Sequence, residues 1–225
     1  MMDENGLYRV NPERGKLSFS KIEIRDILIS MVVLSLAFTI IYRNSTSILN
    51  YFKYYVGGYE YICLFLMCFG LVVFSFLLHE FGHKFTAQRA GLWSEYRMYP
   101  IGLVITLISS VIGFLFAMPG AVMINGQIDK DTYGKISLAG PIVNIVLSAI
   151  GIAACLAFNH SFIVVPMLLM ANLNAFLGFF NLLPIPPLDG SKIVSWNIGI
   201  YIAFLLVAGL EVLYVWQFMP PLYWA

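Results

Sequence analysis

Positions 77–85 read LLHEFGHKF, and three side chains in this stretch have the types and spacing of a zinc site: His79, Glu80 and His83. Residues four apart lie on one face of a helix, so one metal ion can bind both imidazoles. The glutamate lies beside them, near enough to hydrogen-bond a water on the metal, as in the H-E-x-x-H arrangement of zinc peptidases. Zinc lowers the pKa of a bound water to about 7 and polarises a carbonyl group, and the glutamate passes the water's proton to the leaving amine.

The five-residue pattern also occurs by chance in soluble helices, but here it closes an apolar run, Tyr61 to Leu78, that contains no charged residue. Ionisable side chains at membrane depth cost a few kcal/mol each and are functional by default. The alternative is an interfacial polar cluster that caps a helix end. His79 lies about 27 Å along a hydrocarbon core about 30 Å thick, so we expect the site near one face of the bilayer.

The composition is that of a membrane protein. Of the 225 residues, 60% are hydrophobic and 11% are charged, whereas a soluble domain is nearer half apolar and a quarter charged. The net charge of +1 gives no indication of a nucleic-acid partner. Three cysteines lie inside apolar runs, without the spacing of a zinc site or a disulfide framework, and are expected to be small buried hydrophobic residues. They are Cys63, Cys68 and Cys155.

Six apolar windows outline the expected fold, at residues 27–42, 61–83, 99–118, 136–158, 162–183 and 193–217. We expect an all-α polytopic membrane protein with five to six transmembrane helices, a re-entrant segment and a small β-hairpin near the active site, about Asn125-Gly126. An S-x-x-E capping box, Ser20 to Glu23, precedes the first helix.

The expected organisation is a short polar lead followed by one domain. Residues 1–25 form the lead on the cytoplasmic side, and no signal peptide is indicated. Residues 26–225 form a single transmembrane domain, whose catalytic core covers about 61–192.

A catalytic zinc ion takes three protein ligands and keeps one position open, so a third ligand must come from elsewhere in the chain. The remaining histidine, His160, lies in the polar break FNHSF and is expected to be an ordinary surface residue. Asp189 is the better candidate, because it follows the stretch NLLPIPP, whose prolines cannot continue a helix. An unwound segment can carry a carboxylate sideways into the helix bundle. The alternative is a helix-terminating turn at the surface.

The course of residues 98–124 follows from counting membrane crossings. Asp189 must reach the side of the bilayer that holds His83, so the chain must cross an even number of times between them. The two windows that precede Asp189 supply two crossings, and a third at 99–118 would separate the ligands. We therefore expect residues 98–124 to enter and return on one side, with bend points at Ser109, Ser110 and Gly113.

The positive charges agree with this topology. With a cytoplasmic N terminus, eleven lysine and arginine residues fall on the cytoplasmic side, and two, Arg43 and Lys53, fall on the other. Treating 99–118 as a crossing changes the distribution to eight against five. The positive-inside rule therefore favours the re-entrant segment, and it places the N terminus and the zinc site on the cytoplasmic side.

The motifs HEFGH, AGPIVN and FNLLPIPPLDG, in this order and in a membrane setting, resemble the site-2 protease family of intramembrane zinc metalloproteases. The resemblance covers about residues 79–190. It implies one Zn2+ per chain, with the ligands His79, His83 and Asp189, and Glu80 as the catalytic base. It also assigns Asn181 of the N-x-x-P segment to substrate positioning. Many relatives read LDGG followed by arginine, whereas Ser191 and Lys192 follow Gly190 here. The chain has no PDZ-like insertion, and in this it resembles the compact members of the family.

Two helix faces near the predicted site combine small and polar residues. The first face contains Gly140, Asn144 and Ser148, and the second contains Asn174, Gly178 and Asn181. Small residues allow helices to approach closely, and asparagine can hydrogen-bond across the interface. Asn144 is thereby a further candidate for substrate positioning.

These features predict an intramembrane zinc metalloendopeptidase that hydrolyses a peptide bond in or next to a transmembrane helix of a substrate protein, as in regulated intramembrane proteolysis. The edge of a hairpin at 121–128 can hold the unwound substrate by strand addition. A membrane metal transporter or sensor would need polar residues along a path through the bilayer, whereas here they gather at one face. A catalytically inactive helix-binding homologue would have no use for Glu80. The expected partners are a transmembrane substrate and the lipid bilayer.

Overall fold

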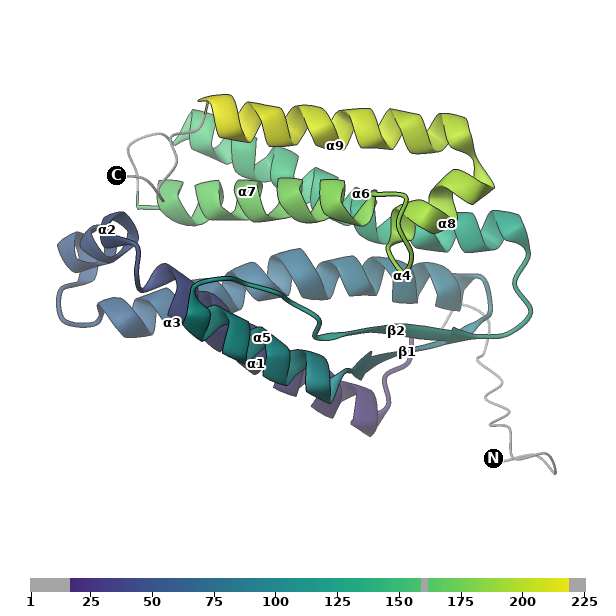
Figure 1. Ribbon diagram of the computed structural model, residues 1–225, viewed down its shortest axis with the longest axis horizontal. Coiled ribbons are helices and arrows are strands. Elements are labelled where there is room, and N and C mark those ends of the chain that lie inside the picture. The colour runs from purple at the N-terminus through teal and green to yellow at the C-terminus, as the bar shows by residue number, and fades with distance from the viewer. Residues whose placement is uncertain (1–16, 159–161, 219–225) are drawn as a thin grey trace.

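The computed structural model describes residues 17–158 and 162–218, most of which are helical, with one small two-stranded sheet (Figure 1). The first half contains α1 (Lys21–Tyr42), α2 (Thr46–Val56), α3 (Glu60–Val72), the π-helical turn η1 (Val73–Leu77), α4 (Leu78–Arg89), β1 (Trp93–Met98) and α5 (Pro100–Ile112). The second half contains β2 (Gly120–Asn125), α6 (Lys130–Ala157), α7 (Val164–Asn181), α8 (Asp189–Trp196) and α9 (Ile198–Phe218).

Five helical stretches within the described residues are long and apolar enough to cross a membrane. They are Lys21–Tyr42, Glu60–Arg89, Lys130–Ala157, Val164–Asn181 and Ile198–Gln217. Large apolar side chains on their outer faces, such as Leu206 and Leu210 of α9, are exposed, as they are on helices that face lipid. The expected polytopic all-α membrane fold is confirmed.

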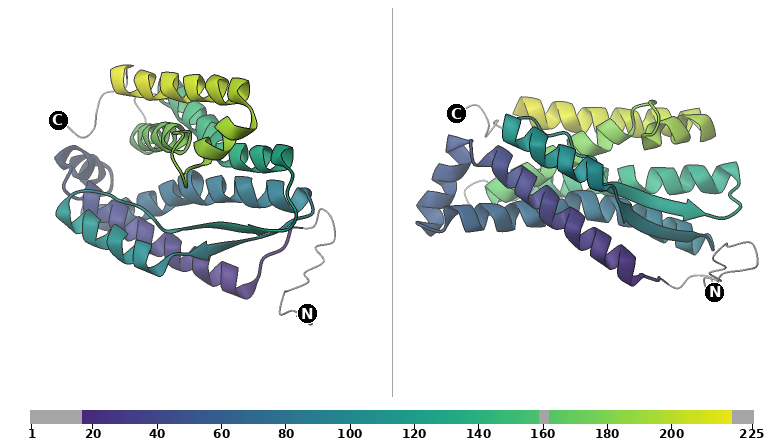
Figure 2. Two further views of the ribbon diagram at one scale, coloured as in Figure 1. Left: turned by 45° about the vertical axis from the view of Figure 1, so that its right-hand side comes forward. Right: turned by 60° about the horizontal axis from the view of Figure 1, so that its bottom comes forward.

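The helices form two groups on either side of α4 (Figure 1). On one side α6 packs against α4, and α7 and α9 follow in turn. On the other side, the two strands form a ribbon between α4 and α1, and α5 lies along α1 (Figure 2). The largest apolar cluster joins α1, α3 and α7, and includes Leu34, Leu64 and Leu169. The helix with the H-E-x-x-H motif is thus central, with a different neighbour on each face.

The segment between the strands returns to its starting point. β1 and β2 are antiparallel with Met98 opposite Gly120, and the Tyr99 N–H donates to the Pro119 carbonyl over 2.8 Å. The 13 residues of α5 extend about 20 Å, too short for a core about 30 Å thick. The helix ends at Gly113, whose φ of 92° is left-handed, and the chain then turns back. The expected return of this segment is confirmed.

The small sheet is present, but its pairing differs from the expected hairpin about Asn125-Gly126. β2 ends at Asn125 and pairs with β1 on the far side of α5. An Asn-Gly pair makes a tight hairpin only where both flanking segments can pair as strands. Here the chain leads directly to Asp129, whose side chain caps α6 by accepting the Thr132 N–H. A helix start therefore occupies the place of the second strand.

The proline-rich stretch behaves as its sequence predicts. α7 ends at Asn181, residues 182–188 are irregular, and α8 begins at Asp189. Gly190 allows the first turn of α8 to lie directly against the end of α7, because a Cβ atom there would come within 2.1 Å of the Leu182 carbonyl oxygen. The aspartate is thus held at a fixed place beside the helix bundle.

Candidate metal centre

α4 presents the two histidines of the motif on one buried face, with their Nε2 atoms 3.1 Å apart. The π-helical turn η1 immediately precedes this helix. Such a turn leaves a backbone carbonyl free of the regular helical bonds, and π-turns are frequent at functional sites. In this chain the Ser75 carbonyl accepts a bond from the Asn144 side chain over 2.9 Å. The irregular turn thereby connects α4 to α6 just ahead of His79.

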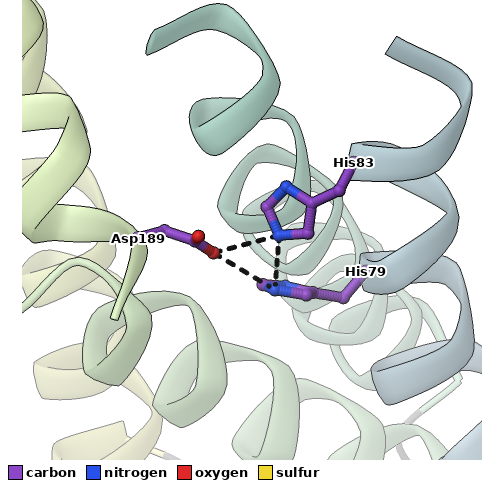
Figure 3. Close-up of side chains that lie close together, drawn as sticks. All are labelled: His79, His83 and Asp189. Carbon is purple, nitrogen blue, oxygen red and sulfur yellow. Dashed lines mark hydrogen bonds and ion pairs between the residues drawn. The ribbon is translucent and has the colours of Figure 1, made fainter. Parts of the chain in front are cut away.

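Asp189 reaches the histidines from α8 (Figure 3). Its Oδ2 atom lies 3.0 Å from His83 Nε2 and 3.5 Å from His79 Nε2. Ligand atoms bound to zinc at 2.0–2.2 Å in a tetrahedral arrangement are about 3.4 Å from one another. The three atoms therefore have the separations of three corners of a zinc coordination tetrahedron, and all three residues are buried. The donor set fits one Zn2+, while His160 lies outside the described residues.

Each histidine is oriented by a hydrogen bond on its other ring nitrogen. His79 Nδ1 lies 2.5 Å from Asn144 Oδ1, and His83 Nδ1 lies 2.7 Å from the Ile136 carbonyl oxygen. The Ile136 carbonyl can only accept, so His83 Nδ1 carries a proton, and when the ring is neutral its Nε2 lone pair faces Asp189. The Asn144 amide is held with its oxygen toward His79, because its Nδ2 donates to Ser75 O and to Asn174 Oδ1. The same tautomer is therefore set for His79.

The two oxygens of Asp189 have different partners. Oδ2 faces the histidines, whereas Oδ1 accepts a hydrogen bond from Lys192 Nζ over 3.0 Å. Burial opposes ionisation of this carboxyl group, but the adjacent imidazoles, when protonated, outweigh burial and hold the pKa of Asp189 well below its usual range. Asp189 is thus ionised, which is the form that binds a metal.

Two glycines let α4 and α6 approach closely at this point. A Cβ atom on Gly140 would lie 2.3 Å from His83 Nε2 and 2.7 Å from His79 Cε1. A Cβ atom on Gly82 would lie 2.8 Å from the Ala139 carbonyl oxygen. Gly140 therefore leaves the space that the imidazoles occupy, a role beyond the helix packing that the sequence indicated. The sequence feature that could have indicated this role is the position of Gly140 four residues before Asn144, on the same face of α6.

Glu80 is buried beside the histidines and faces the sheet. Its Oε2 atom accepts the Val122 N–H of β2 over 3.0 Å. Two cavities meet at this carboxylate. One of about 420 Å³ extends toward Tyr133, Ser137 and Lys192. The other, of about 570 Å³, extends along mostly apolar residues that include Phe76, Met118 and Phe180. The carboxylate is thus reached from two directions, of which the first is the more polar and the second the more apolar.

The remaining candidate from the sequence, Asn181, lies at the end of α7. It lines both cavities, and its Nδ2 donates to the Leu177 carbonyl over 3.0 Å. Asn144 lines only the apolar cavity of the two and has no exposed surface. Its amide oxygen is already engaged by His79. The two asparagines therefore have different surroundings.

Comparisons with known proteins identify zinc metalloproteases as relatives of this chain. Residues 150–202 match the model of peptidase family M50. A protein of Methanocaldococcus jannaschii assigned as zinc metalloprotease MJ0611 is 34% identical over 80% of this chain and 86% of its own length. Rip3 of Mycobacterium tuberculosis, also assigned as a zinc metalloprotease, is 31% identical over 62% of this chain and 33% of its own length. Zinc metalloprotease MJ0392 of M. jannaschii is 30% identical over 56% of this chain and 32% of its own length. No solved structure matches significantly.

Proposed function

Because this chain belongs to peptidase family M50, the site-2 protease family of zinc metalloproteases, we propose that it hydrolyses a peptide bond in or next to a transmembrane helix of another membrane protein. The observation that carries the proposal is the convergence of the ligand atoms of His79, His83 and Asp189, with Glu80 beside them, toward one end of a helical stretch long enough to cross a bilayer. A protease site in that place meets its substrates within the membrane.

In the proposed reaction, different side chains of this protein bind the metal, transfer the proton and position the substrate. The two imidazoles and Asp189 Oδ2 bind the metal, and their hydrogen-bond partners hold them in place. Zinc, when bound, lowers the pKa of a coordinated water to about 7 and polarises the scissile carbonyl. Glu80 accepts the proton of the attacking water on a carboxylate oxygen and delivers it to the leaving nitrogen. Asn181, which lines both cavities, positions the substrate.

The substrate must be extended where it is cut. A transmembrane helix has its carbonyl groups bonded internally, so it must unwind before one of them can be attacked. The edge of β2 that carries the Val122 N–H faces Glu80 and lies along both cavities. A strand added to this edge would place its backbone beside the metal site. The more apolar cavity suits membrane-embedded side chains, and the more polar cavity suits the flanking residues and water.

We further propose that the N terminus and the zinc site are cytoplasmic, as the distribution of positive charge favours. Single cysteines at Arg97→Cys and Lys130→Cys, in a background without native cysteines, should then react with a membrane-impermeant thiol reagent from the cytoplasmic side. Lys53→Cys should react from the opposite side. Labelling of Arg97→Cys and Lys130→Cys from opposite sides would show a crossing between them and contradict this topology.

Asn144 is proposed to orient His79. Replacing Asn144 by alanine removes the acceptor for His79 Nδ1, and loss of such a partner lowers metal affinity by about 10–100-fold. Zinc affinity measured by chelator competition on the purified variant tests this. Ser148→Ala is the matched control, because Ser148 is equally buried one turn further along α6. Wild-type zinc affinity in Asn144→Ala would exclude the orienting role.

A further inference from the structure

One pair of opposed residues in the two-stranded sheet donates its outward-pointing N–H groups to two different carboxylates. Tyr96 of β1 lies opposite Val122 of β2. In an antiparallel ladder, alternate opposed residues do not bond each other, and their N–H groups point outward. The Tyr96 N–H donates to Glu23 Oε1 over 2.8 Å, and the Val122 N–H donates to Glu80 Oε2 over 3.0 Å. This pair of opposed residues, Tyr96 and Val122, thus connects α1 to the Glu80 carboxylate beside the metal site.

The outer edge of β1 is closed by α1. Glu23 and Asp26 are three residues apart and share one helix face, while Tyr96 and Met98 are two residues apart and share one strand edge. The Met98 N–H donates to Asp26 Oδ2 over 3.3 Å, as the Tyr96 N–H does to Glu23. No further strand can therefore pair with β1 at these residues. The edge of β2 that faces the cavities is the one left for a substrate, which would take over the Val122 N–H from Glu80 when it pairs there.

Glu23 also binds the helix of the metal site. Its carboxylate lies 2.9 Å from Lys84 Nζ, and both side chains are fully buried, at 0% exposure. Lys84 follows His83 directly, and its Nζ also donates to the Ser94 carbonyl of β1 over 2.9 Å. Removing one partner of this pair alone would be strongly destabilising, because it would leave an uncompensated buried charge. One carboxylate of α1 thereby ties β1 to α4.

We propose that Glu23 is a positioning residue for the protease reaction. Glu23 acts through the sheet. It holds the opposed residues Tyr96 and Val122 in place against α4. The outer edge of β2 is thereby kept at the distance from Glu80 that an added substrate strand requires. This inference rests on the proposed function, in which the substrate pairs with β2. Glu23 touches neither the metal ligands nor the substrate, so its removal should weaken substrate binding without removing zinc.

Two double variants of the full-length enzyme isolate this role. Glu23→Gln/Lys84→Met and Glu23→Leu/Lys84→Met both remove the ion pair without leaving a buried unpaired charge. Only the glutamine variant keeps an oxygen that can accept the Tyr96 N–H. Lys135→Met, which removes one partner of the exposed Asp131–Lys135 pair, is the surface control. The readouts are zinc content, amide hydrogen exchange of residues 93–98, and kcat and KM for a single-pass model substrate.

The leucine variant should exchange the Tyr96 amide faster and raise KM about tenfold, the effect of losing one buried hydrogen bond, with zinc content unchanged. The glutamine variant should remain close to wild type in both exchange and KM. Unchanged exchange and KM in the leucine variant, or equal impairment of the two variants, would overturn the proposal.

Two provisions keep the outcome decisive. If both double variants lose zinc, the comparison of Asp26→Leu with Asp26→Asn applies the same test at the neighbouring Met98 amide, where the partner cation Arg25 is exposed. Faster exchange and a raised KM only in Asp26→Leu would then support α1 as the holder of the sheet, and no difference would overturn it. Exchange is measured without substrate. A wild-type enzyme that cleaves nothing therefore counts against the proposed function, whereas unchanged exchange counts against Glu23.

Discussion

Replacing Glu80 by glutamine is expected to leave zinc bound and to lower the rate of substrate cleavage by about 10²–10⁴-fold, the range that a general base contributes. The three proposed ligands remain in place in this variant. The glutamine oxygen can still accept the Val122 N–H, so the side chain keeps its position beside β2. What is lost is an oxygen basic enough to take a proton from water. The measurements are zinc content of the purified protein and the rate of cleavage of a single-pass membrane substrate.

Glu60→Gln is the matched control for this variant. Glu60 begins the same helical stretch, Glu60–Arg89, at the end away from the metal site. The control should keep both zinc and cleavage at wild-type levels. If Glu80→Gln cleaved the substrate at the wild-type rate, the carboxylate would not be the base, and the protease mechanism proposed for this site would have to be abandoned.

Replacing Asp189 by alanine is expected to remove most of the bound zinc and, with it, the activity. The change leaves two histidines as protein ligands, whereas a catalytic zinc site has three. The loss in affinity should exceed the roughly 100-fold upper value for losing a hydrogen-bond partner of a ligand. Metal analysis of the purified variant gives the zinc content, and chelator competition gives the affinity. His79→Ala and His83→Ala should behave alike, because the three ligand atoms share one site.

Thermal unfolding provides a second measurement of the same loss. A metal that binds only the folded state stabilises it by mass action, so a chelator should lower the Tm of the wild-type protein. The Tm of Asp189→Ala should be insensitive to the chelator. Asp131→Ala, which changes an exposed aspartate in the first turn of α6, should respond to the chelator as the wild type does. Full zinc content and activity in Asp189→Ala would show that another residue is the third ligand.

Much of the site can be read from local sequence because it depends on local geometry. His79 and His83 face one way since a helix repeats every 3.6 residues, whatever surrounds it. Pro184, Pro186 and Pro187 end regular structure before Asp189, because proline lacks the N–H and clashes with the preceding turn. The return of the chain between Met98 and Gly120 followed from the requirement that the ligands meet on one side of the bilayer. In each case the determining contacts are close in sequence or are set by membrane thickness.

Other features of the site were decided by packing between distant segments. The partner of β2 is β1, across α5, because the residues after Asn125 enter α6 and cannot pair as a strand. The N-cap half of the capping box predicted at Ser20 forms, with the Glu23 N–H donating to Ser20 Oγ, whereas the Glu23 carboxylate is engaged by Lys84, 61 residues away. Asn144 lies against His79, 65 residues earlier in the chain.

The physical reason is that local propensity determines the backbone conformation of each segment. The hydrogen-bond partner of a buried polar group depends instead on which residues the folded helix bundle places beside it. Leaving such a group unpaired in an apolar interior costs about 1–3 kcal/mol, which strongly favours arrangements in which it has a partner. The sequence alone does not distinguish among the several polar residues that could be the hydrogen-bond partner of a given buried group. The sequence therefore determined the spans, the metal-binding motif and the unwound segment that carries Asp189. The tertiary structure alone decided that Glu23 accepts the Tyr96 N–H of the sheet, that Asn144 contacts His79, and that the Val122 N–H donates to Glu80.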